Sequence, residues 1–133
     1  MRSFFLPKEI ILTKDAPAAI GPYSQAVKVN NTVYISGQVP LIPEDMILRS
    51  GGIVEQTEQV FLNLSAIAKA SGGSLDDCVK VNISLTDLFE FDKVNQVMQT
   101  FFSEPYPARA CVQVSALPKG AMIEVEAILV LDT

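Results

Sequence analysis

Two short segments near the end of the chain carry the side chains best suited to chemistry. In "YPARACVQV" the alternation of a strand puts Arg109 and Cys111 on one side and small apolar residues on the other. In "MIEVEAILV" the same alternation puts Glu124 and Glu126 on one face. A guanidinium can hold a carboxylate through two parallel hydrogen bonds, and a partly desolvated glutamate can act as a general base or position a water. The pattern therefore predicts an anion site with an acid–base group beside it.

The connection between these two strands is short, which predicts a hairpin whose directly opposed residues share a face. One register sets Cys111 opposite Glu124 and Arg109 opposite Glu126. The four polar side chains would then cluster on the sheet face that points away from the helices. Contact between subunits is expected on the same face.

Two interpretations of this cluster stay open from the residues alone. Arg109 could form ion pairs with the glutamates at a seam between subunits, since buried arginine–glutamate pairs are common structural features. Alternatively, Arg109 could hold an anionic ligand. Cys111 has no histidine to take its proton, so we expect it to contribute packing or backbone groups rather than a nucleophilic thiolate.

Three residues earlier in the chain could complete a pocket. Tyr23 follows a Gly-Pro pair and could either project its ring into a cleft or pack half-buried. Ser36 and Gly37 end a predicted strand, where they could offer a hydroxyl and backbone groups or simply terminate the strand.

The composition excludes several classes of function. The 133 residues include no histidine, which removes Ser-His-Asp and Cys-His catalysis and most zinc sites, so no metal is expected. The net charge is −5 without a cluster of Lys or Arg, which argues against a nucleic-acid partner. The two cysteines lack metal-ligand spacing, and free thiols in a reducing compartment are favoured over a disulfide.

The sequence also argues against membrane insertion. No apolar run approaches the length of a membrane span, and the run at residues 4–6 is too short for a signal-peptide core. We therefore expect a cytoplasmic protein without a membrane partner.

The chain has no linker or repeat, and its length predicts a single domain over residues 1–133. Hydrophobic periodicity and turn residues predict the element order ββαβαββ, preceded by a short strand at residues 9–12. The main strands are expected at 23–29, 32–36, 77–85, 108–114 and 122–131, the helices at 53–71 and 88–102, and a loop at 40–52. Asp87 and Glu90 are expected to form a capping box at the start of the second helix.

This order predicts an α+β fold in which two helices lie on one face of a single sheet. The other face would then have no helix to cover it. The segment "AILVL" is nevertheless apolar on both faces. We therefore expect a homo-oligomer in which the sheets of several subunits cover one another.

Five segments of the chain match a known family. They are "APAAIGPYSQAV", "YISGQVP", "FDKVNQVMQTFF", "PARACVQV" and "LPKGAMIEVEAILV". In these motifs and in their order, the chain closely resembles the RidA/YjgF family from about residue 16 to about residue 130. The combination of IGPYSQA, SGQ, PAR-x-C-V and a strand with paired glutamates makes the resemblance specific.

The resemblance implies a fold, an assembly and an activity. The fold would be chorismate-mutase-like, with one mixed sheet and two helices on one side. Three subunits would form a homotrimer around a central β-barrel, with clefts at the subunit interfaces. The activity would be hydrolysis of reactive 2-imino and enamino acids, released by pyridoxal-phosphate-dependent dehydratases, to 2-oxo acids and ammonia. The usual substrates are 2-iminobutanoate and 2-iminopropanoate, and the family uses no cofactor.

The resemblance also implies roles for individual residues. Arg109 matches the arginine that binds the substrate carboxylate, and Glu124 matches the acidic residue that holds the attacking water. Glu126 is left with a structural role. The other positions that match the family's substrate pocket are Tyr23, Ser36, Gly37, Asn95 and Cys111.

A different function within the same family is the alternative. Members have been linked to translation inhibition, endoribonuclease activity and chaperone-like holding. The chain could therefore be a small-acid-binding, protein-interaction or translation-modulating member without deaminase activity. Cleavage of RNA is disfavoured by the net charge of −5 and by the absence of histidine.

Overall fold

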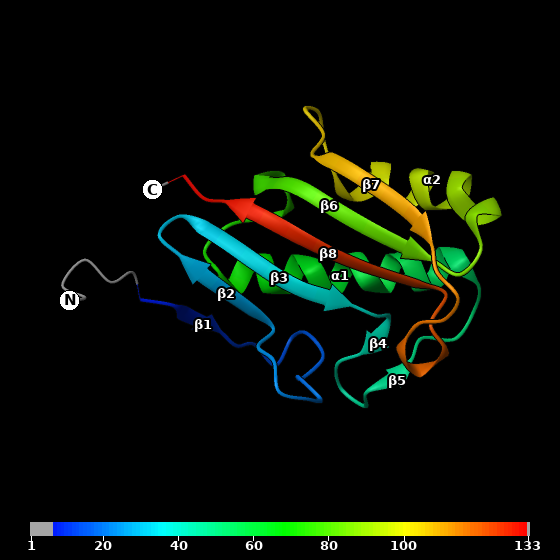
Figure 1. The fold of residues 1–133 in the computed structure, drawn as a ribbon, viewed down its shortest axis with the longest axis horizontal. Helices are drawn as coiled ribbons and strands as arrows, with labels where there is room; N and C mark the ends of the chain where they lie inside the picture. The colour runs from blue at the N-terminus through cyan, green and yellow to red at the C-terminus, as the bar shows by residue number, and fades with distance from the viewer. Residues whose placement is uncertain (1–6, 133) are drawn as a thin grey trace.

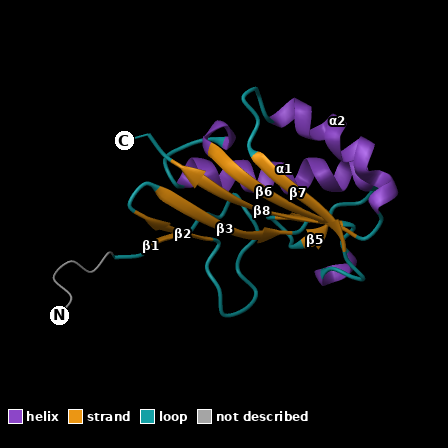
Figure 2. Ribbon diagram, turned by 45° about the horizontal axis from the view of Figure 1, so that its top comes forward, coloured by secondary structure: helices purple, strands orange, loops and turns teal. Residues whose placement is uncertain are grey.

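The computed structural model describes residues 7–132, so the apolar run at residues 4–6 lies outside the described residues. Its main feature is a six-stranded mixed sheet with both helices on one face, as Figure 1 and Figure 2 show. The helices are α1 (Ile53–Ala70) and α2 (Phe91–Phe101). The strands of this sheet are β1 (Glu9–Ile11), β2 (Ala26–Val29), β3 (Thr32–Gln38), β6 (Cys78–Leu85), β7 (Ala108–Gln113) and β8 (Ile123–Val130). The expected α+β fold with two helices on one side is confirmed.

The segment expected to be a loop between β3 and α1 holds a small hairpin instead. Its strands, β4 (Leu41–Ile42) and β5 (Ile47–Leu48), have two residues each, which is too short to show an alternating pattern. Met46 turns the chain with a positive φ of 60°. The buried amide of Asn63 on α1 donates a hydrogen bond to the Leu41 carbonyl at 3.0 Å, which holds the hairpin against the helix.

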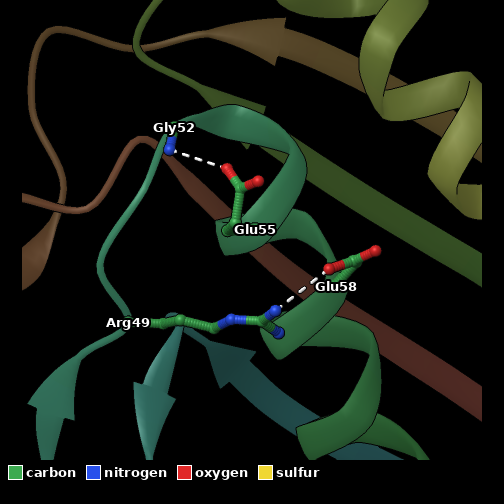
Figure 3. A network of polar contacts seen from close by, with 4 residues as sticks. All are labelled: Arg49, Gly52, Glu55 and Glu58. Carbon is green, nitrogen blue, oxygen red and sulfur yellow. Dashed lines mark hydrogen bonds and ion pairs between the residues drawn. The ribbon is translucent and has the colours of Figure 1, made fainter.

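The first helix starts at a glycine and is stabilised there by charged side chains (Figure 3). The Glu55 carboxylate accepts a hydrogen bond from the Gly52 backbone N–H at 2.8 Å, and this bond holds the pKa of that carboxyl below its usual value. Arg49 reaches Glu58 at 3.1 Å from the preceding loop. A carboxylate in the first turn also interacts favourably with the helix dipole.

The capping box expected at the start of the second helix is not formed as predicted. The Asp87 side chain accepts a hydrogen bond from Phe89 N at 3.0 Å, but it caps a short 3₁₀ turn, Leu88–Glu90, rather than α2 itself. Glu90 instead lies 3.9 Å from Lys93 in an ion pair. The 3₁₀ turn joins directly to α2, so the apolar periodicity of the sequence did not separate the two.

The core lies between the sheet and the helices. Phe61 of α1 is fully buried. The centroid of its ring lies 5.5 Å from that of Phe101 and 5.4 Å from that of Phe102. The inward residues of the central strand β8 complete this layer, and they are Ile123, Val125, Ala127 and Leu129. Aromatic pairs at this spacing contribute packing beyond their buried area.

The prediction of a hairpin between the last two strands is wrong. The order of the sheet is β1-β2-β3-β8-β6-β7, so β8 pairs with β3 and β6 while β7 pairs only with β6, in parallel. The cause is the strand–helix–strand unit β6-α2-β7, because a helical crossover returns the chain parallel to the strand it left. Its next strand, β8, then fills the position between β3 and β6.

The parallel pairing also changes the face on which two predicted site residues lie. Arg109 is opposite Val81 and Cys111 is opposite Ile83, and both of those β6 residues point into the core. Arg109 and Cys111 therefore lie on the helix side of the sheet, not on the open face as expected. Glu124 is opposite Ser84 and does lie on the open face, together with Glu126.

The open face is apolar over much of its area, and it faces the viewer in Figure 1. Cross-strand pairing puts alternate side chains of all six strands on it in rows. Its large exposed apolar side chains are Ile10, Tyr34, Val112 and Val130, each between 45% and 54% exposed. The expected uncovered face is thus present, while the oligomer expected to cover it stays a prediction.

Replacing Phe61 tests the packing of the core. We expect Phe61→Ala to lower the free energy of unfolding by about 3–5 kcal/mol, because it leaves a cavity between α1 and the aromatic pair at the end of α2. Chemical denaturation measures this change. Phe89→Ala is the matched control, since Phe89 is 97% exposed and its loss should change stability by less than about 0.5 kcal/mol. Equal losses in the two variants would contradict this description of the core.

Candidate functional site

The Arg109 guanidinium is held by side chains of α2. Its Nη1 donates to the Asn95 Oδ1 at 2.5 Å and lies 3.7 Å from the Met98 sulfur. Its Cζ lies 5.0 Å from the centroid of the Phe91 ring, within cation–π range. β7 supplies the arginine, and the helix that follows β6 supplies all three partners.

The Arg109 guanidinium lines a cleft, and no ion pair with another described residue balances its positive charge. The cleft has a volume of about 370 Å³ and is lined by Asn95, Met98, Gln99, Tyr106, Pro107 and Arg109. Within residues 7–132, no carboxylate lies within ion-pair distance of Arg109. Ion pairs between Arg109 and the glutamates are therefore not formed within one chain, and such pairs at a seam between subunits stay a prediction. An exposed guanidinium with spare donors can bind a carboxylate.

Glu124 lies in a second cleft on the other side of the sheet. This cleft has a volume of about 350 Å³, and its wall includes Tyr23, Ser36 and Gly37. Gly37 allows the carboxyl to approach the backbone, since a Cβ at this position would lie 2.8 Å from the Glu124 Cδ. The close approach lies where the pairing of β3 with β8 shifts register, between Ile35 and Gln38.

The surroundings of Glu124 favour its protonated form. Burial raises the pKa of the Glu124 carboxyl above its usual value, and the neighbouring charge of Glu126 raises it further. None of the residues described donates a hydrogen bond to this carboxylate in the structure. A carboxylate with a raised pKa is a better proton acceptor than one at the surface.

A buried glutamine holds the wall of the Glu124 cleft. The Gln25 amide donates to the carbonyls of Thr13 and Pro17 at 2.9 and 2.8 Å, and its oxygen accepts from Thr13 N at 2.8 Å. Ser36 Oγ donates to the Ser24 carbonyl at 2.6 Å, which attaches the same segment to the end of β3. Tyr23 accepts a hydrogen bond from Ile20 N at 3.2 Å. These bonds replace the regular ladder that this irregular stretch lacks.

Both cysteines are free, as favoured from the sequence, and neither is activated. Burial raises the pKa of the Cys111 thiol despite the opposing effect of the Arg109 guanidinium. Burial also raises the pKa of Cys78 to about 12, with Asp77 and Asp76 adding to the shift. A raised pKa disfavours the thiolate, in agreement with a packing role for Cys111 rather than a nucleophilic one.

The structure thus divides the predicted residues into two groups on opposite faces. Arg109, Asn95 and Cys111 form one group on the helix side. Glu124, Tyr23, Ser36 and Gly37 form the other group on the open side. Within one chain, the expected pairing of Arg109 and Glu124 in a single pocket does not occur.

The sequence reasoning missed residues that support each group. Phe91 and Met98 contact Arg109, and Gln25 holds the wall beside Tyr23. The spacing 91/95/98 places three residues on one helix face, so it could have indicated a common partner. Nothing in the local pattern distinguishes Gln25 from an ordinary surface glutamine.

Two general features of the described residues bear on function. No group of three or more His, Cys, Asp or Glu side chains among residues 7–132 is placed to hold a metal ion. None of the helices in the described part of the chain is both long and apolar enough to cross a membrane.

Comparison with known proteins gives consistent matches over nearly the whole chain. The sequence matches the family described as Endoribonuclease L-PSP over residues 13–131. The 2-iminobutanoate/2-iminopropanoate deaminase of Mus musculus is 49% identical over 123 residues, which are 92% of this chain and 91% of the mouse protein. The matched region includes both clefts.

Solved structures show the same fold. RidA from an Antarctic Psychrobacter species is 59% identical, with a TM-score of 0.90 over 92% of this chain and 99% of that chain. TdcF of E. coli, solved with bound serine, is 40% identical, with a TM-score of 0.89 over 93% of this chain and 99% of that chain.

Replacing Gly37 tests the approach of the Glu124 carboxyl to β3. We expect Gly37→Ala to fold, because the flexible carboxyl can move away from the new Cβ at a cost below about 1 kcal/mol. The displaced carboxyl should become more exposed, and its pKa should fall towards the usual value. Side-chain carbon NMR across a pH series measures this pKa. Gly52→Ala is the control, since its Cβ meets only Glu55 at 3.9 Å and should leave Glu124 unchanged. An unshifted Glu124 titration in Gly37→Ala would show that the contact is absent.

The pH dependence of thiol alkylation tests the state of Cys111. A raised pKa means a smaller thiolate fraction at every pH below it, so alkylation should be slow at neutral pH. We expect the rate midpoint to lie above that of an unperturbed cysteine in a short peptide, because burial raises the pKa of this thiol. Mass spectrometry of iodoacetamide-treated protein follows Cys111, and a Cys111→Ser variant identifies the background. A midpoint below that of the peptide would mean that Arg109 outweighs burial.

Proposed function

We propose that this chain, which belongs to the Endoribonuclease L-PSP family, also known as RidA/YjgF, hydrolyses reactive 2-imino acids to 2-oxo acids and ammonia. The observation that carries the proposal is the Arg109 guanidinium, which opens into a cleft without a carboxylate partner among residues 7–132. The name of the mouse relative supports small 2-imino acids as substrates. The serine bound to the E. coli relative supports a ligand with an α-carboxylate.

The complete site is formed between two copies of the chain. Arg109 and Glu124 lie on opposite faces of the sheet, so one small substrate cannot contact both within a single copy. The open face that carries Glu124 also has exposed apolar side chains, and a second copy would bury them. Arg109 lies on β7, which is an edge strand of the sheet. In a homotrimer whose open faces pack together, the β7 edge of one subunit would supply Arg109 and the open face of its neighbour would supply Glu124, at three equivalent interfaces.

The chemistry requires only these side chains and a water molecule. The substrate carboxylate binds the Arg109 guanidinium, a contact worth about 1.5–3 kcal/mol for a charge-assisted bond. Glu124 accepts a proton from the water as the water oxygen attacks C2 of the protonated imine, and the electron pair of the C=N bond moves to nitrogen to give a neutral aminoalcohol. Glu124 returns its proton to the nitrogen, the C–N bond breaks as ammonia leaves, and Glu124 takes the hydroxyl proton as the carbonyl forms. General base catalysis of this kind contributes about 10²–10⁴-fold.

The other functions associated with the family fit these observations less well. An endoribonuclease would need to attract a polyanion, yet the chain has a net charge of −5 and no histidine for acid–base chemistry. A small-acid-binding role without catalysis would use Arg109 but would not need Glu124. Activity measurements on variants of the two residues therefore separate catalysis from binding alone.

Single substitutions test the two proposed roles. Arg109→Ala should lower kcat/KM for freshly generated 2-iminobutanoate about 10- to 150-fold through lost carboxylate binding. Glu124→Gln should lower kcat about 10²- to 10⁴-fold while substrate binding is retained. The rate of imine disappearance and of 2-oxobutanoate formation measures both. Full activity of Arg109→Ala would falsify the proposed mechanism.

Mixing the two inactive variants tests whether the site is shared between copies. Subunits of Arg109→Ala still offer Glu124, and subunits of Glu124→Gln still offer Arg109. If they are mixed one to one and refolded together, three quarters of random trimers are mixed and each has one intact site of three. About a quarter of the wild-type activity should return. A site built within one chain would give no recovery.

A further inference from the structure

The partners of Arg109 form a single row on α2. Phe91, Asn95 and Met98 are spaced as residues that share one face of a helix. Each contacts the guanidinium in a different way, through the ring face, an amide oxygen and a sulfur. One face of α2 therefore contacts the Arg109 side chain of β7 through three residues.

These contacts use only part of the donor capacity of Arg109. Asn95 and Met98 both lie on Nη1. Among residues 7–132, no acceptor lies on Nε or Nη2, so this edge of the guanidinium keeps its donors. A carboxylate needs two parallel N–H groups in the guanidinium plane. The free edge offers this pair, provided that the plane is held steady.

The Phe91 ring is the contact that can restrain the plane of the guanidinium. Asn95 and Met98 both contact Nη1 and therefore fix only one corner of the group. The Phe91 ring lies under the guanidinium carbon, with Cζ 5.0 Å from the ring centroid, and a cation is attracted to the face of a ring at this distance. Phe91 is itself placed by β7, since the Gln113 side chain accepts a hydrogen bond from Leu88 N at 2.9 Å, just before α2 begins. The strand that bears Arg109 thus also fixes the turn that delivers the ring.

We propose that Phe91 is a positioning residue for the carboxylate anchor, because its ring holds the Arg109 guanidinium in the plane that a 2-imino acid must meet. The inference rests on the proposed function, since it assigns Arg109 to the substrate carboxylate. Phe91 acts through Arg109 and not on the reacting atoms. Its loss therefore weakens binding of every ligand with this carboxylate and leaves the chemical step intact.

The test compares Phe91→Leu with Phe91→Tyr in the full-length protein. Phe91→Leu keeps an apolar residue with high helix propensity but removes the ring, and Phe91→Tyr keeps the ring. We expect Phe91→Leu to raise KM for 2-iminobutanoate and Kd for the product 2-oxobutanoate by the same factor, roughly three- to tenfold. The value of kcat should change less than twofold, and Phe91→Tyr should match the wild type.

Two further measurements separate positioning from a general structural effect. The Arg109 guanidinium protons should lose their ring-current shift in NMR spectra of Phe91→Leu and keep it in Phe91→Tyr. Phe89→Leu is the matched control, because it makes the same change two residues earlier at a side chain that is 97% exposed. It should leave KM and Kd unchanged. If Phe91→Leu does not fold, Phe91→Met removes the ring with a more adaptable side chain.

The outcomes distinguish this inference from the proposed function. If KM and Kd of Phe91→Leu equal those of the wild type while Arg109→Ala loses activity, the positioning role is overturned and the proposed function stands. A fall in kcat alone would likewise overturn it. If Arg109→Ala keeps full activity, the proposed function fails first, and the role of Phe91 in substrate binding fails with it.

Discussion

The parallel pairing of β7 with β6 determines where the polar side chains of this fold can act. It follows from the crossover through α2, and it directs Arg109 and Cys111 towards the helices. The same pairing leaves the space between β3 and β6 to β8, whose outward residues include Glu124. An antiparallel hairpin of β7 and β8 would have put all of these groups on one face. The sheet order thus determines which residues can share a pocket within one chain.

Each cleft depends on interactions that lie outside regular secondary structure. Near Glu124, the side chains of Gln25 and Ser36 replace missing ladder bonds, and Gly37 allows a carboxyl to lie against the backbone. Near Arg109, α2 offers three kinds of contact to one guanidinium. The two clefts therefore differ in construction. The wall of the Glu124 cleft is an irregular loop stabilised by hydrogen bonds. The Arg109 cleft is formed by one face of α2 packed on β7.

Much of this arrangement follows from local patterns in the sequence. The alternation of "VKVNISL" and the helical spacing around Phe61 place the core elements correctly, and the pairing of Arg109 with Cys111 on one face is right. The face of Glu124 and Glu126 is also right, whereas the face of Arg109 and Cys111 was assigned wrongly, because the alternation shows which residues share a side but not which side meets the helices. The neighbours of β8 depend on the path of α2, which is a property of the whole chain. The register shift in β3 beside Gly37 leaves no mark in the residue pattern.

The separation of Arg109 from Glu124 has a consequence for the folded chain before any ligand arrives. A guanidinium and a carboxylate within reach of each other would form an internal ion pair, and that pair would compete with every incoming anion. Here the two groups lie on opposite faces of the sheet, with β6 between their strands, so they cannot pair within one copy. The guanidinium of a single copy therefore keeps its donors for an incoming anion.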